Sequence, residues 1–353
     1  MSTLNQFYGG SSFSPLLDRL FLSSGTFTPT MTGDYLVVVV GGGGSGGVCN
    51  FGTAASACGG GAGGLAIKKL KLVNGNQYTV VVGAGGASRQ VQGGWREYGN
   101  GGGASSFSGP GITTITANGG STGGYGEWSV GYQSFGGTAS GGDFNLTGGR
   151  SGEITNANPY GVYWVAATGG GAVNIGQGAN ASGSIAKDST YSPDGSWVVA
   201  TGGAGVSGPS PGITGIGGGG WVGTAGGPGL YGIMQSTTTD YTNKIISSVS
   251  SLWLGLIDLS GNVSTGESGL GNNGVGMPAN TYKDVDTGYF QASKKSNIFA
   301  GGCGMAWSSA GGGMRAGDGG IGAGGGGAAN RGPWSQSGAG GNGIVIIAKL
   351  FNI

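Results

Sequence analysis

Glycine dominates this chain and limits what it can fold into. The sequence holds 91 Gly among 353 residues, and they recur in irregular clusters of two, three or four from residue 41 to residue 343. Glycine loses more backbone entropy on ordering than any other residue, so a folded chain of this kind must offset that loss through close main-chain contacts. An ordered structure therefore requires the glycine segments to pack directly against one another.

Disorder and collagen are the two alternatives, and the composition argues against both. Charged residues make up 8% of the chain and aromatic residues 9%, whereas disordered segments are usually charged and poor in aromatics. Collagen needs a strict Gly-X-Y period and abundant proline, but the clusters here are irregular and the chain has only 10 Pro. We therefore expect extended, left-handed glycine segments that exchange N–H···O=C bonds with their neighbours.

Short β-type segments flank the glycine runs. The pattern of residues 65–82 predicts a hairpin around Asn74-Gly75, with a bulge at Lys68-Lys69 that repairs a slip in the alternation of apolar residues. Three further segments have a β-type pattern: 26–40, 112–117 and 344–350. We expect all of these strands to form one small antiparallel sheet.

The chain is treated as one elongated glycine-rich domain, residues 25–353, preceded by an N-terminal segment, 1–24. A short helix is predicted to begin at Ser14, and it would place four apolar residues on one face: Leu16, Leu17, Leu20 and Phe21. This face either folds back onto the core or attaches the protein to a partner. An insertion at about 231–299 has few glycines; a helix at 245–257 and a hairpin around 260–262 are its competing interpretations.

Charge and hydropathy exclude several classes of function. The net charge is +1 without a basic tract, so the sequence gives no indication of binding to nucleic acid or to an anionic membrane. The longest apolar run, Leu36 to Val40, is too short to span a bilayer. Asp18 and Arg19 interrupt the apolar N-terminal segment, which is therefore unlike a secretion signal. We expect assembly in a cytoplasm.

The sequence does not favour an enzyme. It has no histidine, which excludes a serine triad and histidine metal ligands. The stretch LVVVVGGGGSGG matches a dinucleotide-binding fingerprint, but no acidic residue lies between Asp34 and Glu97, where a ribose-binding carboxylate should be. Asp284 and Asp286 have only a faint likeness to a calcium loop and fit a solvated turn better. We expect no catalytic residues, no cofactor and no metal.

Three cysteines, Cys49, Cys58 and Cys303, lack zinc-ligand spacing. Cys49 and Cys58 either form a disulfide or stay as buried free thiols, and cytoplasmic assembly favours the thiols.

Aromatic segments interrupt the glycine clusters and suggest a binding end. The first strand ends near Val40 and the last begins at Ile344, so a sheet that pairs them should mark one end of the molecule. Chain reversals at the opposite end should then bring together aromatics that are distant in sequence. The candidates for receptor binding are Trp95, Tyr98, Tyr125, Trp128, Tyr132, Tyr160, Tyr163, Trp164, Trp197 and Trp221. Some of them must instead cap the glycine segments.

Four motifs in order carry a family resemblance: FTPTMTGDYLVVVVGGGGSGG, GGLAIKKLKLVNGNQYTVVVGAGG, GGGASSFSGPGITTITANGG and GAGGNGIVIIAKL. Together they resemble the glycine-rich domain of bacteriophage tail fibres and of the adhesins at fibre tips. The resemblance covers about residues 26–230 and 301–350; the insertion and the long segment 143–168 depart from the pattern.

The resemblance implies a mainly β and irregular fold: a small antiparallel sheet at the attachment end, a bundle of polyglycine II helices, and protruding loops that recognise the bacterial surface. It implies a virion protein at the tail fibre tip, as one copy or a homotrimer. Its partners would be a fibre protein of the same virion, through the N-terminal segment, and a bacterial surface glycan or outer-membrane protein. The competing hypothesis is a purely structural glycine-rich fibre or cell-wall protein, in which the aromatics only pack.

Overall fold

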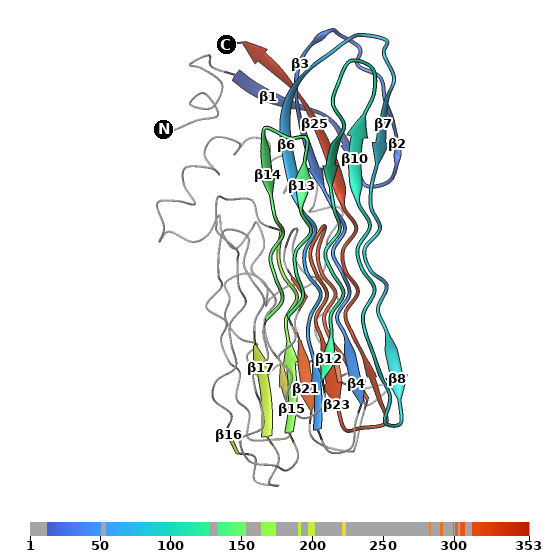
Figure 1. Cartoon of the computed structure of the whole chain (residues 1–353), viewed down its shortest axis with the longest axis vertical. Helices are drawn as coiled ribbons and strands as arrows, with labels where there is room; N and C mark the ends of the chain where they lie inside the picture. The colour runs from blue at the N-terminus through green and yellow to red at the C-terminus, as the bar shows by residue number, and fades with distance from the viewer. Residues whose placement is uncertain are drawn as a thin grey trace.

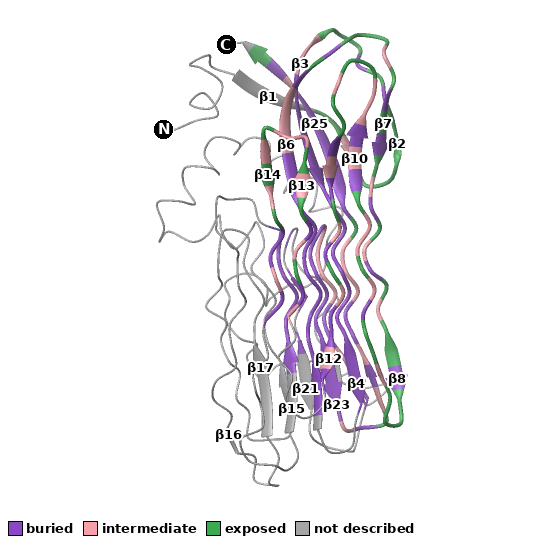
Figure 2. Ribbon diagram, in the orientation of Figure 1, coloured by how far each residue is buried: buried purple, intermediate pink, exposed green. Residues whose placement is uncertain are grey.

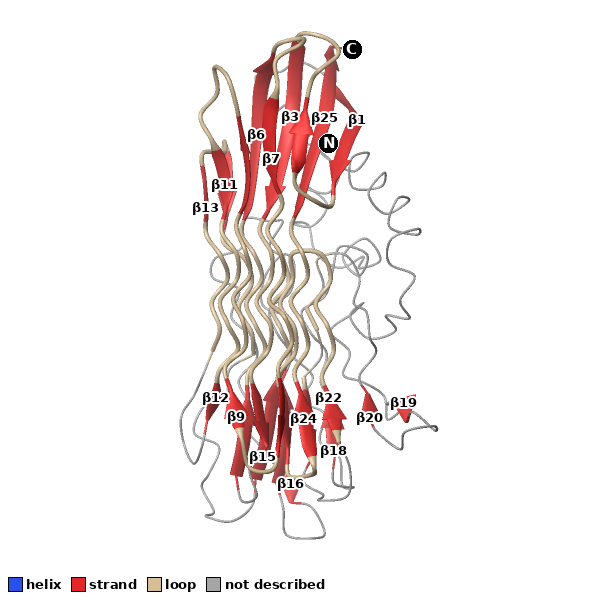
Figure 3. Ribbon diagram, turned by 90° about the vertical axis from the view of Figure 1, so that its right-hand side faces the viewer, coloured by secondary structure: helices blue, strands red, loops and turns tan. Residues whose placement is uncertain are grey.

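The structure is an elongated stack of small β-sheets separated by a layer of glycine segments (Figure 1). The computed structural model describes residues 13–50, 54–126, 133–152, 164–173, 190–191, 197–201, 221–223, 282–283, 290–291, 299, 301–302, 304–307 and 313–352. Within these residues the fold is mainly β, without an α-helix. We call the end that carries strands β3 and β25 the proximal end, and the opposite end the distal end (Figures 1 and 3).

Two antiparallel sheets form the proximal end. The first sheet has the strand order β1 (Phe13–Phe21), β25 (Ile344–Asn352), β3 (Gly33–Val40), β6 (Leu65–Leu72) and β14 (Phe144–Leu146). The second sheet has the order β13 (Ala139–Ser140), β11 (Ile115–Ala117), β10 (Ser105–Ser108), β7 (Tyr78–Val81) and β2 (Gly25–Phe27).

The central strands of the first sheet are buried on both faces (Figure 2). In β3, Val37 and Val39 pack toward the second sheet, whereas Val38 and Val40 join a cluster on the other face. Strand β25 divides its residues in the same way, with Ile346 on one face and Ile347 on the other. Burial on both faces explains why these strands are continuous apolar runs rather than alternating ones.

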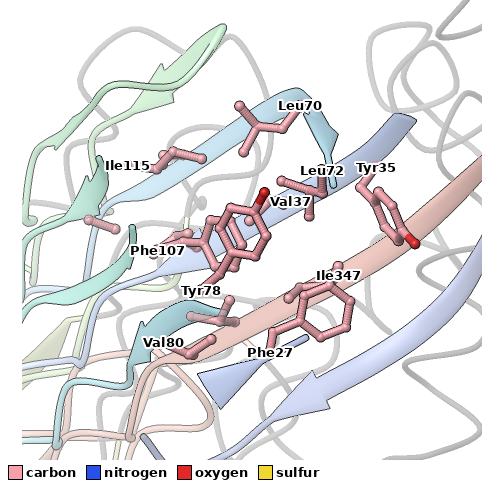
Figure 4. Packing of buried hydrophobic residues seen from close by; sticks show 14 residues of the cluster. Phe27, Tyr35, Val37, Leu70, Leu72, Tyr78, Val80, Phe107, Ile115 and Ile347 are labelled. Carbon is pink, nitrogen blue, oxygen red and sulfur yellow. The ribbon is translucent and has the colours of Figure 1, made fainter. Parts of the chain in front are cut away.

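Aromatic rings fill the space between the two proximal sheets (Figure 4). The rings of Tyr78 and Phe107 stack with their centroids 5.5 Å apart. Tyr35 meets Phe27 edge to face, and its hydroxyl donates to the Met31 carbonyl at 2.9 Å. Burial, followed by the negative charge of Asp18, raises the pKa of Tyr35, so this phenol stays neutral and can donate.

The predicted hairpin and its bulge are wrong. Residues 65–82 do contain two strands joined at Gly75, whose φ is 79°, but β6 belongs to the first sheet and β7 to the second. The register of β6 against β3 is continuous from Leu65 to Leu72. The slip in alternation arises because Leu65 contributes to one core cluster and Leu70 and Leu72 to the other. The single expected sheet is therefore two packed sheets.

The predicted N-terminal helix is also wrong. Residues 13–21 form strand β1, which pairs antiparallel with β25 and has a register irregularity between Leu17 and Arg19. Leu20 packs against one core cluster and Phe21 against the other. Residues 18–21 therefore fold back onto the core of the proximal sheets, which is one of the two alternatives that the sequence leaves open.

Glycine segments run side by side between the two ends (Figure 3). The hydrogen bonds place segment 41–47 at their centre. Its successive N–H groups donate hydrogen bonds to carbonyls of three other segments in turn. The order of these three segments repeats every three residues. These acceptor segments are 58–64, 99–104 and 337–343. Its carbonyls accept from three more segments, 83–89, 118–124 and 323–328. Neighbours around this ring of six also bond to one another, so segment 41–47 is enclosed by main chain.

Close main-chain packing explains why these segments consist mostly of glycine. A Cβ on Gly44 would lie 2.7 Å from the Ser121 carbonyl carbon, and one on Gly324 would lie 2.5 Å from that of Gly60. Gly322 has a φ of 70°, and a Cβ there would meet Val40 and Val173. By contrast, Gly101 lies on the outside, where the nearest atom to a Cβ would be 3.8 Å away. A methyl group therefore does not fit at Gly44, Gly322 or Gly324.

Three mixed sheets form the distal end. The middle sheet has the order β18 (Trp221–Gly223), β21 (Met305–Trp307), β23 (Ala328–Asn330), β4 (Val48–Asn50) and β9 (Arg96–Glu97). On one side lie β12 (Tyr125–Gly126), β5 (Ala54–Ala57), β15 (Trp164–Thr168), β17 (Trp197–Thr201) and β16 (Thr190–Tyr191). On the other lie β19 (Tyr282–Lys283), β20 (Phe290–Gln291), β22 (Met314–Arg315), β24 (Trp334–Gln336) and β8 (Gln90–Gln92).

Small residues pack between two of these distal sheets, so the sheets approach closely. The cluster consists of Cys49, Ala55, Ala57, Ala167 and Ala329. Of the insertion, the structure describes only 282–283, 290–291 and 299, so the predicted helix at 245–257 and the acids Asp284 and Asp286 lie outside the described residues. No helix in the described part is long and apolar enough to cross a membrane.

Candidate functional site: the distal aromatic end

The described candidate aromatics all lie at the distal end, in strands or turns that follow or precede glycine segments (Figures 1 and 3). Trp95 lies in the turn between β8 and β9, Tyr98 follows β9, and Tyr125 begins β12. Trp164, Trp197 and Trp221 begin β15, β17 and β18. The remaining candidates, Trp128, Tyr132, Tyr160 and Tyr163, lie outside the described residues.

Tyr98, Tyr125 and Arg96 form a cluster, which we call the Tyr–Arg cluster. The rings of Tyr98 and Tyr125 lie 4.5 Å apart between centroids. The Arg96 guanidinium carbon lies 5.5 Å from the centroid of the Tyr125 ring, within the range of a cation–π interaction. Tyr98 is 49% exposed. The cluster therefore presents rings and a cation to solvent.

The distal sheets hold the Tyr–Arg cluster in place. Tyr125 packs against the small-residue core of the distal sheets, and its strand pairs with β5 through Ala57. Arg96 lies in β9, where it is the register partner of Cys49. Because residues two apart in an extended segment lie on one side, Arg96 and Tyr98 both reach the Tyr125 ring. Paired strands thus position Arg96 and Tyr125, and the Gly99 N–H, next to Tyr98, donates to the Gly123 carbonyl at 2.9 Å.

Trp95 is 72% exposed, compared with 49% for Tyr98. It follows Gly93 and Gly94, whose φ angles of 59° and 88° are left-handed and favour glycine. The Asn50 N–H donates to the Trp95 carbonyl at 2.8 Å and fixes the turn to β4. Nearby, the Arg89 guanidinium forms an ion pair with the Glu97 carboxylate, with 3.6 Å between nitrogen and oxygen. It also donates a hydrogen bond to the Asn100 side-chain oxygen at 2.8 Å. A rigid turn thus presents an exposed indole.

Strand register brings four tryptophans together in two pairs. Trp164 is opposite Trp197 in parallel strands, and Trp221 is opposite Trp307 in antiparallel strands. Neither Trp307 nor Arg96 is among the binding residues predicted from the sequence. Strand pairing identifies Trp307, because it lies opposite Trp221. Arg96 is identified only by its contact with the Tyr125 ring.

The described cysteines are buried free thiols, as favoured from the sequence, at Cys49 and Cys58; Cys303 lies outside the described residues. Burial raises the pKa of Cys49 from 9.0 to about 11, despite opposing effects of the Ser56 backbone and Arg96. The thiol is therefore protonated near neutral pH and is a poor nucleophile. Within the described ranges, no three His, Cys, Asp or Glu side chains gather as they would around a metal ion.

The apolar residues proposed for attachment lie at the other end of the molecule. Leu16, Leu17, Leu20 and Phe21 are all in β1, at the proximal end (Figure 1). Exposed apolar side chains also occur there, including Met31 and Phe351. Lys349 lies between these two, 2.9 Å from the Met31 sulfur and 5.2 Å from the Phe351 ring centroid.

Comparison with known proteins agrees with the glycine pattern. The model of a family described as a glycine-rich domain matches residues 22–239. No curated protein matches the chain. Since the family match covers more than half of the sequence, the chain belongs to the glycine-rich domain family.

Proposed function

We propose that this protein is a non-enzymatic adhesin at the tip of a bacteriophage tail fibre, which recognises a bacterial surface through its distal aromatics. The observation that supports the proposal best is the exposure of Trp95 and Tyr98 at the distal end, in a segment that main-chain hydrogen bonds hold at Trp95 and Gly99. Rigid aromatic side chains provide a large contact area at a small entropy loss, which suits a binding surface. The sequence motifs that resemble tail fibre adhesins agree with it.

We also propose that the glycine segments are polyglycine II helices. Two observations support this: hydrogen-bond partners of segment 41–47 repeat every three residues, and exposure repeats with the same period on outer segments. In segment 83–89, Ala84 and Ala87 are exposed whereas Gly83 and Gly86 are buried. A threefold left-handed helix without internal hydrogen bonds has this period. Such a bundle would act as a rigid spacer between attachment and recognition.

Attachment would use the proximal end. In this proposal, residues 1–24 with Leu16, Leu17, Leu20 and Phe21, together with the exposed Met31 and Phe351, contact a fibre protein of the same virion, with one copy or three at the fibre tip. The arrangement keeps attachment and recognition at opposite ends of the glycine layer.

Alanine variants of the distal aromatics test the function. We expect Trp95→Ala or Tyr98→Ala to weaken binding to host cells by about 2 kcal/mol or more, because exposed aromatic anchors carry much of the free energy of binding. Their melting temperatures should stay close to that of the parent, since both side chains are largely exposed. The measurement is cell binding beside thermal melting.

Phe135→Ala provides the matched control. Phe135 is 55% exposed, and the Arg150 guanidinium carbon lies 4.7 Å from the centroid of its ring. Because Phe135 belongs to a segment of the glycine layer and not to the distal end, this variant should bind cells as the parent does. If every variant that loses cell binding also melts earlier, the aromatics are packing residues, and the structural-fibre hypothesis is the better one.

A further inference from the structure

We propose that Gln90, Gln92 and Trp95, which together we call the turn face, bind a neutral hexose unit of a bacterial surface polysaccharide. The Trp95 indole would stack on the sugar ring, and the two amides would hydrogen-bond to its hydroxyls. This inference rests on the proposed adhesin function and names the ligand class for one part of the distal end. It also adds two glutamines, which lie outside the aromatic set, to the binding surface.

A tight turn places Gln92 and Trp95 side by side. The two residues between them, Gly93 and Gly94, have φ angles of 59° and 88°, the values expected for the central residues of a type I′ turn. The first and last residues of such a turn lie opposite each other with both side chains on one face, and their Cβ atoms are about 5 Å apart. A Cβ on either glycine would have no atom within 4 Å. An amide and an indole therefore flank one open surface.

Gln90 extends this surface along β8. Alternate residues of a strand point to the same side, and β8 follows this rule: Gln90 and Gln92 are exposed, whereas Val91 between them is buried (Figure 2). Within the described part of the chain, the two amides and the Trp95 indole make no hydrogen bond to the protein. Their donors and acceptors are therefore available to a ligand.

The chemistry of the turn face suits a neutral sugar. Each amide offers one acceptor oxygen and two N–H donors, and the indole offers one donor. Sugar hydroxyls both donate and accept, and the apolar C–H face of a pyranose packs on an aromatic ring. None of the three side chains carries a charge, so the turn face itself cannot neutralise a buried carboxylate or ammonium group. A neutral ring with several hydroxyls is the ligand that these groups match.

Hydrogen bonds to two different distal sheets hold the turn. Gln92 is the register partner of Trp334 in β24, and the Asn50 N–H donates to the Trp95 carbonyl at 2.8 Å. Beyond Trp95, β9 pairs with β4. Because the turn is fixed on both sides, little order has to be gained when a ligand binds.

Calorimetric titration of the full chain with 4-linked tetramers of glucose, mannose, galactose and galacturonic acid tests the ligand class. The last two probes differ only at C6, which is an alcohol in galactose and a carboxylate in galacturonic acid. At least one neutral tetramer should bind the parent protein at millimolar concentration, and more tightly than the acidic tetramer does.

Variants of the turn face locate the site. Trp95→Ala should weaken binding of that neutral tetramer at least about tenfold, and Trp95→Phe should keep part of the affinity because it retains an aromatic face. Gln92→Leu should weaken binding about fivefold, since it removes the amide at similar size. Phe135→Ala, in the glycine layer, should bind as the parent does. Thermal melting identifies a variant that fails to fold, and the remaining turn-face variants then decide.

Three results would overturn the inference: binding of no neutral tetramer at millimolar concentration, tighter binding of the acidic tetramer than of every neutral one, or unchanged affinity in folded Trp95→Ala. Cell binding separates this inference from the broader function. If Trp95→Ala loses cell binding at an unchanged melting temperature while no neutral tetramer binds the parent, the adhesin function stands and the receptor is of another class, such as an outer-membrane protein. If the tetramer binds at the turn face but no distal variant changes cell binding, the adhesin function fails and the sugar site remains.

Discussion

Gly44→Ala and Gly324→Ala are each expected to destabilise the protein by at least about 3 kcal/mol. In both cases the added methyl would overlap a main-chain carbonyl of a neighbouring segment, and backbone cannot rotate away as a flexible side chain can. Because each segment is bonded to several others, moving one segment strains the whole layer. The measurement is chemical or thermal unfolding of the purified variants.

Gly101→Ala is the control for this prediction. Its Cβ would have 3.8 Å of space, and alanine reduces the entropy of the unfolded chain, so stability should stay the same or rise slightly. Equal melting of all three variants would contradict the close packing of the glycine layer.

Ile346→Ala and Ile347→Ala, at consecutive positions of β25, should each lower the free energy of unfolding by about 3 kcal/mol. In a strand with one solvated face, truncating only one of two successive residues lowers the free energy of unfolding strongly. Here Ile346 packs into one core cluster and Ile347 into the other, and both are fully buried. Denaturant unfolding of the two variants measures the effect.

Phe351→Ala is the comparison for these two variants. Phe351 lies in the same strand but is 42% exposed, so the expected loss is below about 1 kcal/mol. A large effect at only one of the two isoleucines would show that one face of the first proximal sheet is not a packed core.

Local turn chemistry could be predicted from the sequence, but strand partners could not. Asn74-Gly75 does form a turn, yet the strands on its two sides pair with strands far away along the chain, in different sheets. The assumption of one buried face produced the false bulge at Lys68-Lys69. The N-terminal helix failed for a related reason: pairing with β25, more than 300 residues away, overrides the weak local preference of segment 13–21.

The distal candidate site could be predicted in part. Glycine runs that begin at one strand end and return to another do place Trp95, Tyr98 and Tyr125 at the end opposite β3 and β25. The sequence also predicts that aromatics distant along the chain meet there, as Tyr98 and Tyr125 do, but it does not predict their other neighbours. Arg96 belongs to the candidate site because β9 pairs with β4 and the Tyr125 ring lies beside its guanidinium. Trp307 belongs to it because it is the register partner of Trp221. Both depend on contacts between strands distant in sequence.

Hydrogen exchange of the full chain, free and bound to outer-membrane vesicles of a host bacterium, is the most direct test of recognition by the distal end. We expect slower exchange on binding at residues 90–98, around the Trp95 turn and the Tyr–Arg cluster, with no change at the proximal turns 28–32 and 73–77. Protection of those proximal turns, with none at residues 90–98, would contradict receptor recognition through the distal aromatics.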